Sequence, residues 1–230
     1  SGPLFIIGSI GVSIFGKPVY GVILYLIHII SSIIVGVMFR GYQKDKHQSP
    51  PTRINQREMT IPEIFATSLN ESAKSILTVC FSILFFSAIS RALFDLIPMS
   101  QSLSAILYGI CEFSTGALGI GNLELDAVYK LILVSFVVGF SGLCVHIQVM
   151  AVTADSGLSL KPYIFGKVLH SIIAAVITTA MVFIVPVFNK FTAPQTFGIS
   201  QTLWVSVMIL AVGVGAVLGL RLVIRRKNTA

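Results

Sequence analysis

Charge is the first thing that this sequence lacks. Only 11% of its 230 residues are charged, whereas 55% are hydrophobic, and the mean hydropathy is +0.91. About a quarter of the residues in a soluble domain are charged, and a globule of this size could not remove so much apolar surface from water. These values exclude a soluble enzyme, a nucleic-acid-binding domain and a secreted disulfide scaffold. They predict an all-α polytopic membrane protein.

Cysteine is rare and the common catalytic motifs are missing. The three cysteines, Cys80, Cys111 and Cys144, are isolated within apolar segments and have no zinc-site spacing. The sequence contains no P-loop, dinucleotide fingerprint, HExxH motif or nucleophile–base motif. We therefore expect no catalytic residue, no metal site and no cofactor, and we expect that the protein is not an enzyme.

What the chain does have is apolar sequence long enough to cross a bilayer, which takes about 20 helical residues. Five such stretches cover residues 20–40, 76–97, 128–150, 163–187 and 203–224. A polar loop follows the first stretch, and a capping box at residues 60–63 begins an amphipathic helix. We expect this helix to lie on the membrane surface before the chain turns in.

A shorter apolar stretch, residues 103–120, decides the topology. If it enters and leaves the membrane on one side, ten of the 16 basic residues lie on a single face, which the positive-inside bias identifies as cytoplasmic. A complete crossing would instead place the basic residues 225–227 outside. We therefore predict a re-entrant hairpin and a cytoplasmic C-terminus, and we attribute the net charge of +7 to cytoplasmic loops rather than to a nucleic-acid partner.

Two parts of the chain carry the same short sequences in the same order. Ser1-Gly2 precedes Lys17-Pro18, and Ser141-Gly142 precedes Lys161-Pro162. The predicted topology puts the two Lys-Pro pairs on opposite sides of the membrane, as in the inverted repeats of secondary transporters. We expect the later part of an inverted-repeat, transporter-like fold, with residues 1–16 as a partial span and a further part of the protein preceding Ser1.

The predicted organisation has three parts. Residues 1–40 hold the end of a broken helix and the first full span, residues 41–75 hold the cytoplasmic loop and amphipathic helix, and residues 76–230 form the second repeat with its hairpin.

Two features inside the membrane are candidates for a site. The sequence Gly-Phe-Ser-Gly at residues 139–142 favours a break in a helix, although the same small residues also suit close helix packing. Glu112 lies on the hairpin, where a carboxylate usually faces a cavity or a partner. The alternative for Glu112 is a structural cap on the amides of the hairpin.

Other polar residues also lie within apolar stretches. His146 and Gln148 follow the break but are two residues apart, so they lie on different helix faces and cannot both line one narrow path. The alternative for His146 is helix packing. Arg91 and Asp95 are four residues apart and are expected to form a structural ion pair. His28 and His170 suit either a solute path or hydrogen bonds between helices.

Four sequences together resemble the YlbJ-type sporulation integral membrane proteins: SGPLFIIG at residues 1–8, EFSTG at 112–116, GFSGLCVHIQ at 139–148 and KPY at 161–163. The resemblance implies a nucleoside-recognition "Gate" domain, similar to parts of concentrative nucleoside transporters and ferrous-iron transporter pores. It also implies a multi-pass protein of the bacterial cytoplasmic membrane in endospore formers, with a role in spore maturation and spore cortex formation.

These observations lead to one main interpretation and one alternative. The main interpretation is a path that moves or senses a small polar solute such as a nucleoside-like molecule. Its candidate residues are Ser1, Gly2, Pro3, Glu112, Ser114, Thr115, Gly116, Ser141, Gly142, His146 and Gln148. The alternative is a non-transporting scaffold that recruits spore-assembly proteins. The expected partners are the lipid bilayer, a small polar solute with a coupling ion, and spore-assembly proteins or further copies of the chain, with no nucleic acid.

The topology can be tested by labelling single cysteines in intact membranes. Cysteines placed at Gln48 and Asn228 should react only from the cytoplasmic side, and a cysteine at Asn122 only from the opposite side. Labelling of Asn228 from outside would contradict the hairpin and the inverted repeat together, because both depend on the parity of the spans.

Overall fold

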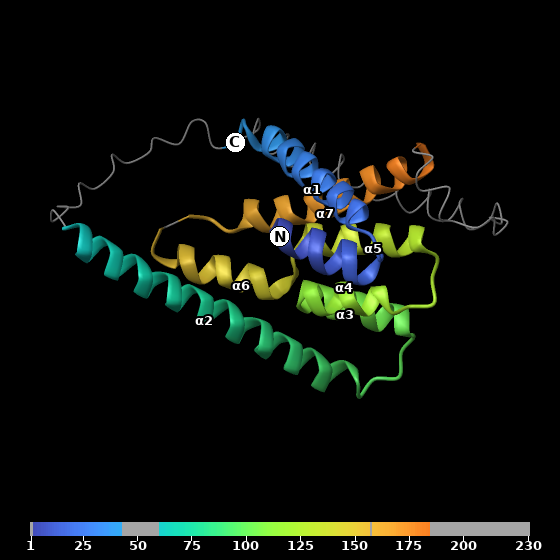
Figure 1. Ribbon diagram of the computed structural model, residues 1–230, viewed down its shortest axis with the longest axis horizontal. Coiled ribbons are helices and arrows are strands. Elements are labelled where there is room, and N and C mark those ends of the chain that lie inside the picture. The colour runs from blue at the N-terminus through green and yellow to red at the C-terminus, as the bar shows by residue number, and fades with distance from the viewer. Residues whose placement is uncertain (1, 43–59, 157, 185–230) are drawn as a thin grey trace, which may run out of the picture.

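The computed structural model describes residues 2–42, 60–156 and 158–184, and every element in these ranges is helical, as the sequence predicts (Figure 1). The elements are η1 (Leu4–Ile14), α1 (Pro18–Phe39), α2 (Ile61–Phe94), α3 (Gln101–Cys111), α4 (Phe113–Gly121), α5 (Ala127–Phe140), α6 (Gly142–Thr153), η2 (Ala154–Ser156) and α7 (Lys161–Ile184). The element η1 is a π-helix and η2 is a short 3₁₀-helix.

Four helical segments in the described ranges are long and apolar enough to cross a membrane. They are Pro18–Phe39, Ile61–Phe94, Ala127–Thr153 and Lys161–Val182. These segments contain or closely match the first four stretches predicted from hydropathy. The fifth predicted span, residues 203–224, and most of the predicted cytoplasmic loop lie outside the described residues.

Helix α2 differs from the prediction of a surface helix followed by a turn into the membrane. The amphipathic part and the apolar part form one continuous helix of 34 residues. The capping box forms as expected, with the Thr60 amide donating to the Glu63 carboxylate at 2.9 Å. No turn separates residues 75 and 76, because the segment contains no Gly or Pro to interrupt the helix after its first turn. The helix is about 51 Å long at 1.5 Å per residue, which exceeds the hydrocarbon thickness.

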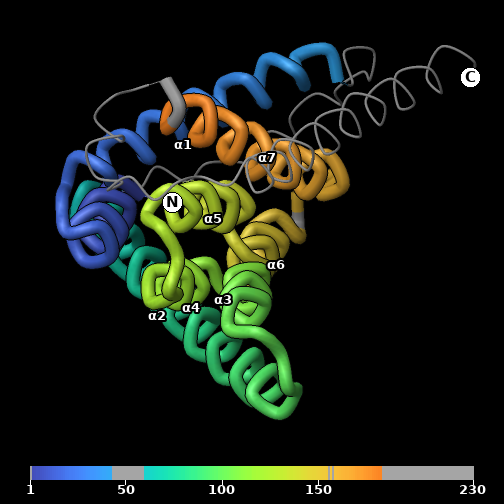
Figure 2. Tube along the Cα trace, turned by 90° about the vertical axis from the view of Figure 1, so that its right-hand side faces the viewer, coloured from blue at the N-terminus to red at the C-terminus, as the bar shows by residue number. Residues whose placement is uncertain are grey.

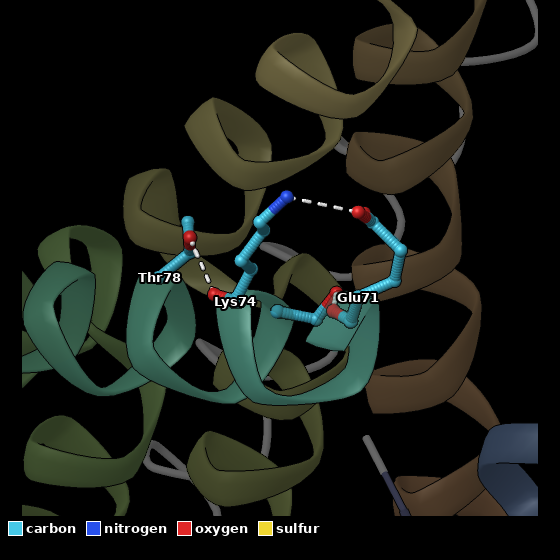
Figure 3. A network of polar contacts seen from close by, with 4 residues as sticks. Glu71, Lys74 and Thr78 are labelled. Atoms are coloured by element: carbon cyan, nitrogen blue, oxygen red, sulfur yellow. Dashed lines mark hydrogen bonds and ion pairs between the residues drawn. The ribbon is translucent and has the colours of Figure 1, made fainter. Parts of the chain in front are cut away.

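The amphipathic half of α2 is held by local polar contacts (Figure 3). The Lys74 ammonium lies 2.9 Å from a Glu71 carboxylate oxygen, and the Thr78 hydroxyl donates to the Lys74 carbonyl at 2.9 Å. Such contacts satisfy the hydrogen-bonding groups of polar side chains within the helix itself, so that no residue from another helix is needed. They explain how the helix can carry charged residues next to a membrane-spanning segment.

Helix α5 occupies the centre of the packing. It contacts α7 on one side and α3 and α4 on the other, while α2 packs on the outer side of α3 and α6 (Figure 2). Its residues Val134 and Val137 are almost completely buried, together with Ile10 of η1 and Ile120 of α4. The hairpin and the broken helix are therefore held by the same core.

The hairpin predicted for residues 103–120 corresponds to α3 and α4, which pack closely against each other. A Cβ atom at Gly116 would lie 2.0 Å from the Gly109 Cα atom and 2.3 Å from its nitrogen, and one at Gly119 would lie 3.4 Å from the Ala105 Cβ atom. This pairing makes the two helices antiparallel. Neither helix, at 11 and 9 residues, is long enough to cross the membrane.

The Gly116 contact predicts a large stability difference between two neighbouring glycines. Gly116→Ala should lower the melting temperature of the detergent-solubilised protein clearly, since its Cβ atom meets backbone that cannot move aside. Gly119→Ala is the matched control, because its Cβ atom would make only ordinary contacts and Ala raises helix propensity by about 1 kcal/mol. Equal melting temperatures for the two variants would contradict the close approach of α3 and α4.

Candidate functional site

Glu112 joins the two helices of the hairpin and is fully buried. Its backbone is extended (φ −143°, ψ 112°), which ends α3 and begins α4. One carboxylate oxygen accepts a hydrogen bond from the Ser114 amide at 3.0 Å, and the other accepts from the Thr115 amide at 2.7 Å and the Ser114 hydroxyl at 2.6 Å. The carboxylate is thus the N-cap of α4, placed at the positive end of that helix.

The predicted break between residues 139 and 142 is present in the structure. Helix α5 ends at Phe140 and α6 begins at Gly142, with Ser141 between them in the left-handed conformation at φ 72°. The Ser141 hydroxyl donates backward to the Val138 carbonyl at 3.2 Å. No side chain therefore caps the first turn of α6, whose amides begin at the break.

The hairpin and the break touch each other through backbone atoms. Gly142 has φ 71°, and a Cβ atom there would lie 2.9 Å from the Phe113 nitrogen and 3.2 Å from both the Cys111 carbonyl oxygen and the Glu112 Cα atom. Glycine is required at this position both by its left-handed conformation and by the space available. The structure thus brings Glu112 and the break into one site.

His146 lies one turn into α6 and its side chain is only 4% exposed. Its Nδ1 atom lies 2.7 Å from the Gly142 carbonyl oxygen, and because a carbonyl can only accept, Nδ1 carries the hydrogen. In the neutral ring Nε2 is then an acceptor, and no described residue makes a hydrogen bond to it. The ring packs against the rings of Phe140 and Tyr163, with centroid distances of 4.8 and 5.4 Å.

The remaining hairpin candidates serve contacts between helices. The Thr115 hydroxyl lies 3.1 Å from the Ser87 hydroxyl of α2, and Gly116 packs on Gly109 of α3. Ser114 stays with Glu112, as described above. Of the hairpin residues predicted to form the site, Glu112 and Ser114 therefore lie at the tip, whereas Thr115 and Gly116 also hold the hairpin in place.

Gln148 is directed away from the break. Its amide nitrogen lies 3.2 Å from the Cys144 sulfur, and its side chain lines a cavity of about 390 Å³ between α6 and α2. His146 and Gln148 thus lie in different surroundings, as their spacing predicts. Gln148 is not brought together with Glu112 in one cavity.

The N-terminal candidates lie near the hairpin tip because they precede η1, which contacts it. Pro3 precedes η1, and the Gly2 carbonyl accepts a hydrogen bond from the Ile6 amide at 3.2 Å. Two residues after Pro3, the Phe5 ring meets the Phe113 ring edge-on at 5.1 Å. Ser1 lies outside the described residues.

The expected ion pair between Arg91 and Asp95 is not formed, and this prediction requires correction. The Asp95 carboxylate instead accepts a hydrogen bond from the Tyr108 hydroxyl of α3, next to a contact between the Phe94 and Tyr108 rings at 5.7 Å. The only ion pair within the described ranges joins Glu71 and Lys74. The Tyr108 hydroxyl, from a neighbouring helix, satisfies the Asp95 carboxylate. The four-residue spacing of Arg91 and Asp95 within one helix could not indicate a donor from another helix.

A second polar region lies between α1 and α7, around His28 and His170. The His170 Nε2–H donates to the His28 carbonyl at 3.1 Å, so these two histidines form the interhelical hydrogen bond that was one of their two interpretations. Beside them is a cavity of about 580 Å³ that also contains Tyr163 and Lys167. The sequence feature that could have indicated this region is Lys167, a cation inside an apolar stretch.

The described part of the chain contains no group of three or more His, Cys, Asp and Glu side chains that could hold a metal ion. Its four long apolar helices, the short hairpin and the broken helix define a multi-pass helical membrane protein.

Comparison with known proteins places the chain near one curated relative. It is similar to the sporulation integral membrane protein YlbJ of Bacillus subtilis (strain 168), with 24% identity over 217 residues that cover 76% of this chain and 52% of that protein. The chain therefore spans about half the length of this relative. No family model matches the chain, and no solved structure matches it.

The left-handed conformation of Ser141 predicts a stability difference between two substitutions. Both Ser141→Gly and Ser141→Ala lose the hydroxyl and its hydrogen bond to Val138. Only glycine adopts φ 72° without the strain that a side chain causes, so the free energy of unfolding should be about 1 kcal/mol higher for the Gly variant than for the Ala variant. Thermal unfolding in detergent measures both, and a Gly variant less stable than the Ala variant would contradict the strained geometry.

Proposed function

We propose that this chain is part of an integral membrane protein that acts in sporulation, in spore cortex formation or maturation, by moving or sensing a small polar solute. The solute class is a nucleoside-like molecule, and the fold is an inverted-repeat, transporter-like one that contains a Gate domain. No enzymatic activity is assigned. The similarity to YlbJ, which is named as a sporulation integral membrane protein, supports the role in sporulation.

The observation that carries the solute proposal is the contact between the hairpin tip and the helix break, next to an unpartnered nitrogen. Gly142 touches the backbone on both sides of Glu112, and the His146 ring donates to the Gly142 carbonyl. The Nε2 atom of His146 is buried without a hydrogen bond from the described residues. Leaving such a group unpaired costs about 1–3 kcal/mol, and a solute that donates a hydrogen bond would remove this cost.

Two further features of the break suit a site for a polar solute. The first-turn amides of α6 have no side-chain cap, and interrupted helices in transporters direct such amide groups at the substrate. Ser141 keeps a left-handed conformation that favours glycine, and strained residues of this kind are concentrated at functional sites.

The scaffold interpretation is favoured by a different observation. Three donors at the tip of the hairpin, the Ser114 amide, the Ser114 hydroxyl and the Thr115 amide, are directed to the Glu112 carboxylate, which therefore acts as a helix cap without any solute. In that case the close contact at Gly142 only joins two structural units, and spore-assembly proteins or further copies of the chain are the partners.

Two substitutions of His146 separate these functions. In His146→Asn the side-chain amide can still donate to the Gly142 carbonyl, but no atom occupies the position of Nε2. In His146→Gln the longer side chain places an acceptor near the position of Nε2. If Nε2 accepts a hydrogen bond from the solute, the Gln variant should retain activity, whereas the Asn variant should lose about tenfold, which corresponds to one hydrogen bond.

The measurement uses the full-length protein in a sporulating host. Heat-resistant spores are counted, uptake of labelled nucleosides into membrane vesicles is followed, and melting temperature and protein level serve as controls for folding. If the Asn variant is as active and as stable as the parent, Nε2 does not bind a solute. That result would contradict the solute function and favour the scaffold function.

A further inference from the structure

A cavity between α1 and α7 lies outside the proposed solute site. It has a volume of about 580 Å³ and lies between the second half of α1 and the first three turns of α7. The two helices run beside each other there, as both views of the fold show (Figures 1 and 2). Its polar lining residues are His28, Ser32, Tyr42, Tyr163, Lys167 and His170.

Lys167 gives this cavity a positive charge. Its side chain is partly buried, and among the residues that the structure describes no carboxylate forms an ion pair with it. Lys167 lines the same cavity as His28 and His170. A partly buried cation between apolar helices is costly without an anion, because burial removes water that would solvate the charge. The low dielectric around it also strengthens its attraction to any anion that enters the cavity.

The hydrogen-bond roles of the neighbouring groups limit what the cavity can bind. Ser32 already donates to the Ile29 carbonyl at 2.7 Å, and His170 donates to the His28 carbonyl. Lys167 supplies up to three donors, and the Tyr163 hydroxyl, four residues earlier on the same face of α7, is a further donor. This donor set fits a compact anion with several oxygens, such as a phosphate group.

The position of the cavity favours a phosphate carried by a lipid. Tyr42, three residues after the end of α1, lines it together with Phe39 and with Pro162 at the start of α7, and tyrosine is enriched at the membrane–water interface. The adjoining surface of α1 is apolar, with Ile29 and Ile33 exposed by 36% and 59%. An acyl chain can lie along this surface while the headgroup enters the cavity.

We infer that the cavity between α1 and α7 binds the phosphate headgroup of an anionic phospholipid, held by the Lys167 ammonium with the Tyr163 hydroxyl. Basic pockets between membrane helices at the cytoplasmic side are established sites for anionic headgroups. The predicted topology places this end of α1 and α7 at the cytoplasmic side. The inference does not depend on solute movement at the break, because it uses neither Glu112 nor Nε2 of His146.

The test compares the parent with two lysine variants of α7 in the full-length protein. Lys167→Gln removes the charge but keeps a polar side chain with two N–H donors, one bond shorter than lysine. Lys161→Gln is the matched control, because Lys161 is exposed on the same helix and does not line the cavity. Each protein is placed in nanodiscs of phosphatidylcholine with increasing phosphatidylglycerol, and bound lipid is counted by native mass spectrometry.

We expect phosphatidylglycerol to raise the melting temperature of the parent and of Lys161→Gln. Lys167→Gln should bind this lipid about tenfold more weakly, as expected when a charge-assisted hydrogen bond is lost. Equal binding by all three proteins, or an equal loss in both lysine variants, would overturn the inference. Stabilisation of the parent by inorganic phosphate in pure phosphatidylcholine would also overturn it, since the site would then take soluble phosphate.

A second variant guards against a folding defect in Lys167→Gln. Tyr163→Phe keeps the ring that contacts His146 but removes the hydroxyl. It should fold normally and weaken binding of phosphatidylglycerol by a smaller factor than the loss of charge, about threefold. Unchanged lipid binding in this variant, together with normal binding by any folded Lys167 variant, would exclude a phosphate site in the cavity.

Discussion

The structure depends on a single backbone contact, in which Gly142 lies against the hairpin tip at Phe113 and Glu112. A helix interrupted at membrane depth exposes amides and carbonyls that lipid cannot satisfy, so such a break is stable only where protein or water covers it. The hairpin provides this cover and has the same difficulty at its own turn. There the Glu112 carboxylate satisfies the amides that begin α4. Each interruption of the helical structure therefore requires the other.

This constraint explains why small residues are placed where they are. The hairpin can reach the break only because α3 and α4 approach closely at Gly109 and Gly116, and because α5 carries the completely buried Val134 and Val137 between the hairpin and α7. Glycine in a membrane helix has two functions, close packing and conformational freedom, which sequence alone does not distinguish. Here Gly116 serves the first function and Gly142 serves both.

Much of the fold could be predicted because its determinants are local. Hydropathy located the four long apolar helices of the described residues, the glycine and serine residues located the break, and the short apolar stretch with Glu112 located the hairpin. The unpredicted parts depend on pairs of residues far apart in the chain. Tyr108 bonds to Asp95 from another helix, and Lys167 faces His28 only after α1 and α7 have packed. Of the site residues predicted from the sequence, Glu112, Gly142 and His146 lie together in the structure, whereas Gln148 faces α2.

Tyr163 connects the two polar regions of the molecule. Its ring packs against His146 beside the break, and the same residue lines the cavity that contains Lys167. The same residue thus adjoins both the His146 ring and the cavity that Lys167 lines. The two proposed sites differ in what they would take, since Nε2 of His146 would accept a hydrogen bond from a solute and Lys167 would bind an anion. Because one residue of α7 adjoins both regions, a shift of α7 would change both of them together.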